Sequence, residues 1–118
     1  MTVTLHGIAN CDTVKKARAW LEERGTVYVF HDYKKAGIHP ALLERWAKEG
    51  GWERLLNRSG TTFRKLADAD KADLDKDKAL ALMIAQPGMI KRPVMTGAGP
   101  LLIGFKVVEW EAAFAATR

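Results

Sequence analysis

Two β-rich runs enclose one amphipathic helical pattern near the start of the chain, and this order restricts the fold. Residues 3–8 and 27–30 read as short strands, and apolar positions at Val14, Ala17 and Leu21 define one face of a helix between them. A strand, a helix and a strand at this spacing form a unit with two parallel strands and a right-handed crossover. The sequence therefore predicts an α/β fold whose sheet contains a parallel pair.

Helical patterns dominate the middle of the chain, and β-rich runs return near its end. A polar loop is expected at residues 31–37, and a largely helical insertion at about residues 38–86. Residues 94–96 and 101–104 read as an antiparallel hairpin. The closing helix, residues 105–116, offers five side chains to the core: Val107, Val108, Trp110, Ala113 and Phe114. We expect one domain, residues 1–118, with a four-stranded mixed sheet and flanking helices.

Length and composition are those of an ordinary soluble globule. The chain has 118 residues, of which 47% are hydrophobic and 28% are charged. We expect no membrane span and no signal peptide, and a single cysteine favours the reducing cytoplasm. The net charge of +5 suggests tolerance for anionic ligands. Basic and acidic residues are interleaved, however, so dedicated nucleic-acid binding is not expected.

The only cysteine, Cys11, lies where the first predicted strand passes into the first predicted helix. Asn10 or Asp12 can serve as the N-cap, and either choice places Cys11 at the helix N-terminus. Free backbone N–H groups and the positive end of the helix dipole favour a thiolate there, and Lys15 adds a positive charge one turn later. The alternative is a small buried, unreactive thiol, which is the commoner use of a lone cysteine.

Four short stretches, taken together, extend this pattern along the whole chain. They are Gly-Ile-Ala-Asn-Cys-Asp-Thr-Val-Lys-Lys-Ala at residues 7–17, Phe-His-Asp-Tyr-Lys-Lys-Ala-Gly-Ile at 30–38, Phe-Arg-Lys-Leu at 63–66 and Ile-Lys-Arg-Pro-Val at 90–94. In this order they resemble the arsenate reductase-like ArsC/Spx family, and within it the YffB-type subgroup. The resemblance implies a thioredoxin-like fold in which Cys11 is the nucleophile.

The resemblance also implies roles for residues far from Cys11 in the sequence. Arg64 and Arg92 would hold an anion beside the thiol, together with Asn10 and Lys15, and Pro93 would be a cis-proline that faces it. The residue before a proline is held extended, and guanidinium groups bind oxyanions and carboxylates bidentately. The alternative for each arginine is an ordinary surface salt bridge.

The expected function is that of a monothiol reductase without a tightly bound cofactor. Members of this fold with two thiols carry Cys-x-x-Cys, but Val14 occupies the fourth position here. A disulfide at Cys11 must therefore be resolved by an external thiol, with glutathione the expected co-substrate or a glutaredoxin-type protein the donor. We expect a monomer.

Two other functions remain open at this point. One is a non-catalytic Spx-like module that binds RNA polymerase or another protein. The other is arsenate reduction, although Gly104 occupies the position where arsenate reductases of this family carry a further arginine. The three histidines, His6, His31 and His39, have no metal-ligand spacing, so we expect no metal site and a structural role for His6.

Overall fold

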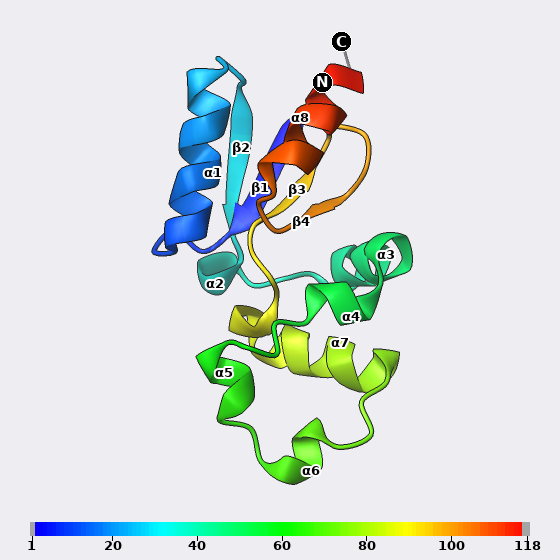
Figure 1. Ribbon diagram of the computed structural model, residues 1–118. Helices are drawn as coiled ribbons and strands as arrows, with labels where there is room; N and C mark the ends of the chain where they lie inside the picture. The colour runs from blue at the N-terminus through cyan, green and yellow to red at the C-terminus, as the bar shows by residue number, and fades with distance from the viewer. Residues whose placement is uncertain (1, 117–118) are drawn as a thin grey trace. The chain divides into compact units, whose positions relative to one another are not determined.

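The computed structural model describes residues 2–116, which form two compact units (Figure 1). The first unit comprises Met1–Ala36 and Arg92–Arg118, and the second comprises Gly37–Lys91. The second unit contains the segment predicted as a helical insertion at about residues 38–86 and extends beyond it to Lys91. No helix among the described residues is long and apolar enough to cross a membrane. The assignment of residues 1–118 to one domain stays a prediction.

A four-stranded mixed sheet is the frame of the first unit. Its strand order is β2-β1-β3-β4, as Figure 1 shows. Strand β1 pairs in parallel with β2 and antiparallel with β3, and β3 pairs antiparallel with β4. This arrangement confirms the predicted parallel pair and hairpin. The strands are β1 Val3–Gly7, β2 Tyr28–Asp32, β3 Val94–Thr96 and β4 Leu102–Ile103.

Two helices, α1 (Asp12–Glu23) and α8 (Val107–Ala116), pack against one face of this sheet. Side chains alternate between the faces of a strand, so Val3 and Leu5 of β1 point toward the helices. The sequence assigned Val107 and Val108 to this core, and that was wrong, because their side chains are 41% and 80% exposed. Val108 lies off the buried stripe of α8, and Val107 lies in the first turn. The buried residues of α8 are Trp110, Ala113 and Phe114.

Helix α1 ends as its sequence predicts, in a glycine-dependent motif. Gly25 has φ +70°, and its N–H bonds to the carbonyl oxygen of Glu22 at 3.0 Å. The Thr26 N–H bonds to the carbonyl oxygen of Leu21, also at 3.0 Å. This pair of bonds is a Schellman motif, which satisfies the last carbonyl groups of the helix before the chain enters β2.

The polar loop predicted at residues 31–37 was wrong. Strand β2 continues to Asp32, and the next residues form the short helix α2, Tyr33–Ala36. The cause is local: Asp32 Oδ1 accepts hydrogen bonds from the backbone N–H groups of Lys34 at 3.0 Å and Lys35 at 3.3 Å. An aspartate that binds the free N–H groups in this way stabilises a helical turn.

The second unit is largely helical, as predicted. Its N-terminal helix is capped by His39, whose Nδ1 accepts from the Ala41 N–H at 3.1 Å. Asp75 caps a later helix by accepting from the Lys78 N–H at 2.8 Å. The elements are α3 Pro40–Gly50, α4 Trp52–Leu55, α5 Thr61–Arg64, α6 Asp68–Lys71, α7 Lys76–Ala85 and the 3-10 turn η1 Pro87–Met89.

Candidate active site around Cys11

Cys11 is itself the N-cap of α1. Its backbone is extended, with φ −136° and ψ 126°, and the helix begins at Asp12. The Lys15 N–H bonds to the Cys11 carbonyl oxygen at 2.9 Å, which closes the first turn. The prediction that Asn10 or Asp12 is the cap was therefore wrong, because Cys11 is the last extended residue and Asp12 is the first helical one. The predicted position of Cys11 at the helix N-terminus is nevertheless confirmed.

The surroundings of the half-buried Cys11 sulfur favour its ionised form. Burial acts to raise the pKa of the thiol, but hydrogen bonds from the Val14 N–H, the Arg92 guanidinium and the Thr13 N–H outweigh it. The charge of Arg92 acts in the same direction, so the pKa of Cys11 is lowered overall. These donors therefore stabilise chiefly the thiolate, which is the nucleophilic form.

Arg92 and Pro93 are the two residues before β3, and their expected part in anion binding stays a prediction. The peptide bond between them is cis, as predicted, and Pro93 is buried. Arg92 is half-buried, and its guanidinium donates to the Cys11 sulfur and to the Tyr33 hydroxyl oxygen. An arginine with two such partners is not a surface salt bridge. The structure thus joins Arg92 to Cys11 within the first unit.

Tyr33 is a site residue that the sequence analysis missed. Its side chain is fully buried, and this burial raises the pKa of its hydroxyl although Arg92 acts to lower it. The phenol therefore stays protonated and presents its oxygen to Arg92. One signal in the sequence was available. Tyr33 directly follows a strand that is parallel to the strand before Cys11, and carboxyl ends of parallel strands meet at one edge of a sheet.

Asp32 connects Tyr33 to the loop that carries Cys11. Its Oδ1 caps α2, while its Oδ2 accepts a long hydrogen bond from the Ala9 N–H at 3.4 Å. Gly7 and Asp32 are paired in register at the ends of β1 and β2. Asp32 therefore fixes both the approach to Cys11 and the turn that places Tyr33.

The other predicted site residues lie on the surface. Asn10 and Lys15 are exposed on either side of Cys11, and their contribution to anion binding stays a prediction. Arg64 belongs to the second unit, where it is the exposed last residue of α5, and its carbonyl oxygen accepts from Lys71 Nζ at 2.9 Å. Its expected place beside Cys11 also stays a prediction.

His6 has the structural role that the sequence suggested. It is 6% exposed, its Nδ1 lies 2.8 Å from Nδ1 of His31, and its Nε2 lies 3.2 Å from Oγ1 of Thr96. Burial, and then the charge of His31, lower the pKa of His6 to about 4. His6 is therefore neutral at physiological pH. Within residues 2–116 no three His, Cys, Asp or Glu side chains are grouped so that they could hold a metal ion.

Comparison with known proteins identifies the family. The ArsC family model matches residues 6–113. A solved structure of a YffB protein is 56% identical, with a TM-score of 0.91 over 95% of this chain and 98% of that chain. An arsenate reductase (ArsC) related protein from Brucella melitensis is 54% identical, with a TM-score of 0.76 over 97% of this chain and 95% of that one.

A regulator is also among the relatives. The global transcriptional regulator Spx of Listeria innocua is 30% identical over 112 residues, which cover 87% of this chain and 79% of the regulator. The fold is thus the thioredoxin-like one of these neighbours. Since the family model spans nearly all of the sequence and the neighbours match at nearly full length, the chain belongs to the ArsC family.

Proposed function

We propose that the chain is a glutathione-dependent monothiol reductase with Cys11 as its nucleophile. The observation that carries the proposal is the set of donors around the Cys11 sulfur, namely the N–H groups of Val14 and Thr13 and the Arg92 guanidinium. A thiol with a lowered pKa is ionised to a larger extent at neutral pH, and the thiolate is the form that attacks sulfur. A merely structural cysteine has no need of a charged donor.

The proposed substrate is a mixed disulfide between glutathione and another thiol. The Cys11 thiolate attacks the glutathione sulfur, which forms a Cys11–glutathione disulfide and releases the other thiol as a thiolate that takes a proton from water. The thiolate of a second glutathione then attacks the glutathione sulfur of this adduct. Oxidised glutathione leaves, and the Cys11 thiolate is restored. Overall, the mixed disulfide and one reduced glutathione become the free thiol and oxidised glutathione, so the second glutathione is the reductant.

The need for an external thiol follows from the sequence. Cys11 is the only cysteine, and Val14 stands where two-thiol members of the fold carry the second. An adduct at Cys11 consequently persists until a second thiol reaches it. Arg92 supports both steps, because its guanidinium stabilises the attacking thiolate in the first and the leaving Cys11 thiolate in the second.

The test is mass spectrometry combined with a turnover assay. Wild-type protein incubated with oxidised glutathione should gain one glutathione, and reduced glutathione should remove it. With a small glutathione mixed disulfide as substrate, oxidised glutathione should accumulate catalytically. Cys11→Ser should abolish both signals. A wild-type protein that forms no adduct and produces no oxidised glutathione above the uncatalysed rate would refute the proposal.

A second candidate is a regulator that binds a protein partner, which the similarity to Spx of Listeria innocua favours. Purified bacterial RNA polymerase is the probe for it. A regulator should form a stable complex with the polymerase that survives Cys11→Ser, whereas the proposed reductase requires Cys11. Arsenate reduction, suggested by the Brucella melitensis neighbour, is tested in the same turnover assay with arsenate as the oxidant.

A further inference from the structure

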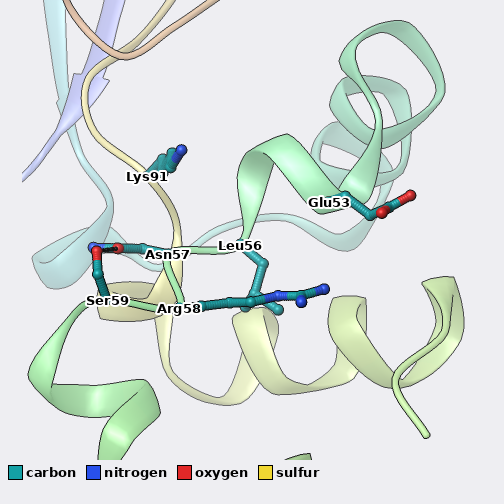
Figure 2. Close-up of a pocket in the computed structure, with 6 residues that line it drawn as sticks. All are labelled: Glu53, Leu56, Asn57, Arg58, Ser59 and Lys91. Carbon is teal, nitrogen blue, oxygen red and sulfur yellow. Dashed lines mark hydrogen bonds between the residues drawn. The ribbon is translucent and has the colours of Figure 1, made fainter.

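A polar pocket lies within the second unit (Figure 2). Its volume is about 390 Å³. Sites for small molecules occupy roughly 300–1,000 Å³, so this pocket has room for a small ligand. Leu56 is the only apolar side chain in its wall, which disfavours lipids and aromatic compounds. The lining residues are Glu53, Leu56, Asn57, Arg58, Ser59 and Lys91.

Backbone hydrogen bonds hold the two segments of the wall together. Leu56 and Ile90 form an isolated antiparallel bridge. Beside it, the Asn57 N–H bonds to the Met89 carbonyl oxygen at 2.8 Å, and the Lys91 N–H bonds to the Leu55 carbonyl oxygen at 2.7 Å. The segment that ends in Lys91 is thus fixed against the segment that leads to Arg58. The pocket is formed by a paired backbone and not by a single loose loop.

The charges in this wall have no ion-pair partner among the described residues. No carboxylate of residues 2–116 lies within 4.0 Å of the Arg58 guanidinium or the Lys91 ammonium, and Glu53 is likewise without an ion pair. The Arg58 guanidinium lies 5.8 Å from the ring centre of Trp52, a cation–π contact that restricts its position. In Figure 2 the side chains of Arg58 and Glu53 extend toward the same side of the pocket.

The uncharged groups add directional hydrogen bonds. Ser59 Oγ donates to Asn57 Oδ1 at 3.0 Å, which fixes the orientation of the carboxamide. The Asn57 amide N–H groups then remain available as donors, and the Ser59 oxygen remains available as an acceptor. The wall therefore carries two cations, one carboxylate, an amide donor and a hydroxyl acceptor.

We propose that this pocket binds an acidic amino acid or a small acidic peptide, with its carboxylates paired to Arg58 and Lys91 and its ammonium paired to Glu53. Guanidinium and ammonium groups bind carboxylates through charge-assisted hydrogen bonds, which are about twice as strong as neutral ones. Glutathione, with two carboxylates and one ammonium, has the complementary set of charges. As far as glutathione is the ligand, the inference rests on the proposed function.

The test is a titration followed by NMR in the Cys11→Ser variant, where no covalent adduct can form. Glutathione, glutamate and inorganic phosphate are the probes, at low salt because screening weakens surface charge pairs. Glutathione and glutamate should shift the backbone amide signals of residues 53–59 and 91. The double variant Arg58→Gln/Lys91→Gln should weaken their binding by at least about tenfold, which corresponds to ~1.4 kcal/mol.

A matched control separates a specific site from general positive charge. Arg45 and Lys48 are exposed residues of α3 in the same unit, so Arg45→Gln/Lys48→Gln removes the same charges elsewhere. This control should keep binding within about twofold. Glu53→Gln should weaken glutathione and glutamate but not phosphate, since phosphate has no ammonium. Equal weakening by both double variants, no shifts at these amides, or tighter binding of phosphate than of glutamate would overturn the proposal.

The outcome is independent of the chemistry at Cys11. If neither glutathione nor glutamate binds in the pocket but wild-type protein still forms and resolves the glutathione adduct, the proposed function holds and this inference is wrong. If glutathione binds at the pocket and no adduct ever forms at Cys11, the inference stands and the proposed function falls.

Discussion

The Arg92 guanidinium donates a hydrogen bond to the Cys11 sulfur, and the sheet explains why these two residues meet. Cys11 follows β1, and Arg92 precedes β3, which is antiparallel to β1 with Val94 opposite His6. The end of one strand and the start of its antiparallel neighbour lie at the same edge of a sheet. Both residues therefore reach that edge from opposite ends of the chain, together with the N-terminus of α1.

Arg92→Ala should raise the pKa of Cys11. The substitution removes both the hydrogen bond and the nearby charge, while the backbone donors at Val14 and Thr13 remain. A charge-assisted bond contributes about 1.5–3 kcal/mol, and partial exposure of Cys11 puts the effect near the lower end. At ~1.4 kcal/mol per decade, alkylation and glutathionylation at neutral pH should slow roughly tenfold. The pH dependence of iodoacetamide labelling measures the shift.

Arg92→Lys is the companion variant for this prediction. It restores the charge but not the planar fork, so it should recover only part of the rate. Wild-type Cys11 should titrate below the ordinary thiol value of ~8.5. Thermal melts of all three proteins control for folding. Identical labelling midpoints in wild type and Arg92→Ala, with unchanged melts, would contradict a role of Arg92 at the thiol.

Tyr33→Phe should raise the pKa of Cys11 less than Arg92→Ala does. The buried Tyr33 hydroxyl is an acceptor for Arg92, so its removal leaves the guanidinium less fixed in front of the sulfur. Tyr28→Phe is the matched control, because the Tyr28 hydroxyl bonds to Arg18 and Glu22 of α1. Labelling midpoints should move in Tyr33→Phe and stay in Tyr28→Phe. The Cys11 labelling midpoint could instead shift in Arg92→Ala and stay unchanged in both tyrosine variants. Tyr33 would then not be needed to position Arg92.

The spacing of apolar residues and the position of turn residues were enough to predict the strands and the first helix of the first unit. Alternating and helical patterns located β1, α1 and the β3–β4 hairpin, and Gly25 marked the end of α1. The parallel pair followed from spacing alone, because a strand, a helix and a strand leave few other topologies. The resemblance added the partner of Cys11, since no local pattern links Arg92 to a residue so far away in sequence.

Contacts that form only in the tertiary structure could not be predicted from the sequence pattern. Asp32 lies in a polar run that reads as a loop, yet its carboxylate binds two N–H groups of α2 and the Ala9 N–H. The third bond exists only once β1 and β2 are paired. Tyr33 was missed for the same reason. The N-cap was wrong by one residue, a normal error when Asn, Cys and Asp are adjacent.

Gly97→Ala should unfold or strongly destabilise the protein. Gly97 has φ +97°, and a Cβ at this position would lie 1.8 Å from the Thr2 carbonyl oxygen. The clash is with backbone, so no side chain can move to relieve it. Gly25→Ala is the control, because Gly25 has φ +70° but no atom within 4 Å of the added carbon. Urea unfolding should show a loss of about 1 kcal/mol for Gly25→Ala and several times that for Gly97→Ala. Equal losses would mean that β1 and the hairpin turn separate easily.

The buried His6 and the partly buried His31 form a pair that makes stability depend on pH through β1 and β2. Their rings meet edge to face, and one Nδ1 donates to the other at 2.8 Å. This bond requires a neutral acceptor, and Thr96 occupies the second nitrogen of His6. Burial, and then the charge of His31, lower the pKa of His6 to about 4, and a proton added to His6 would also have to displace one of these hydrogen bonds.

The pair should make the protein lose stability in mild acid. Between pH 6.5 and about 4 the unfolded chain binds a proton at His6 that the folded chain does not. The stabilisation is thus complete above pH 6.5 and lost as the pH falls toward the folded pKa, an amount on the order of 3 kcal/mol. Urea unfolding at several pH values measures it, and the difference between wild type and His6→Gln removes the contribution of carboxylates. His6→Gln should lose this part of the wild-type pH dependence. A His6→Gln variant with that same dependence would show that His6 is protonated as easily in the folded chain as in the unfolded one.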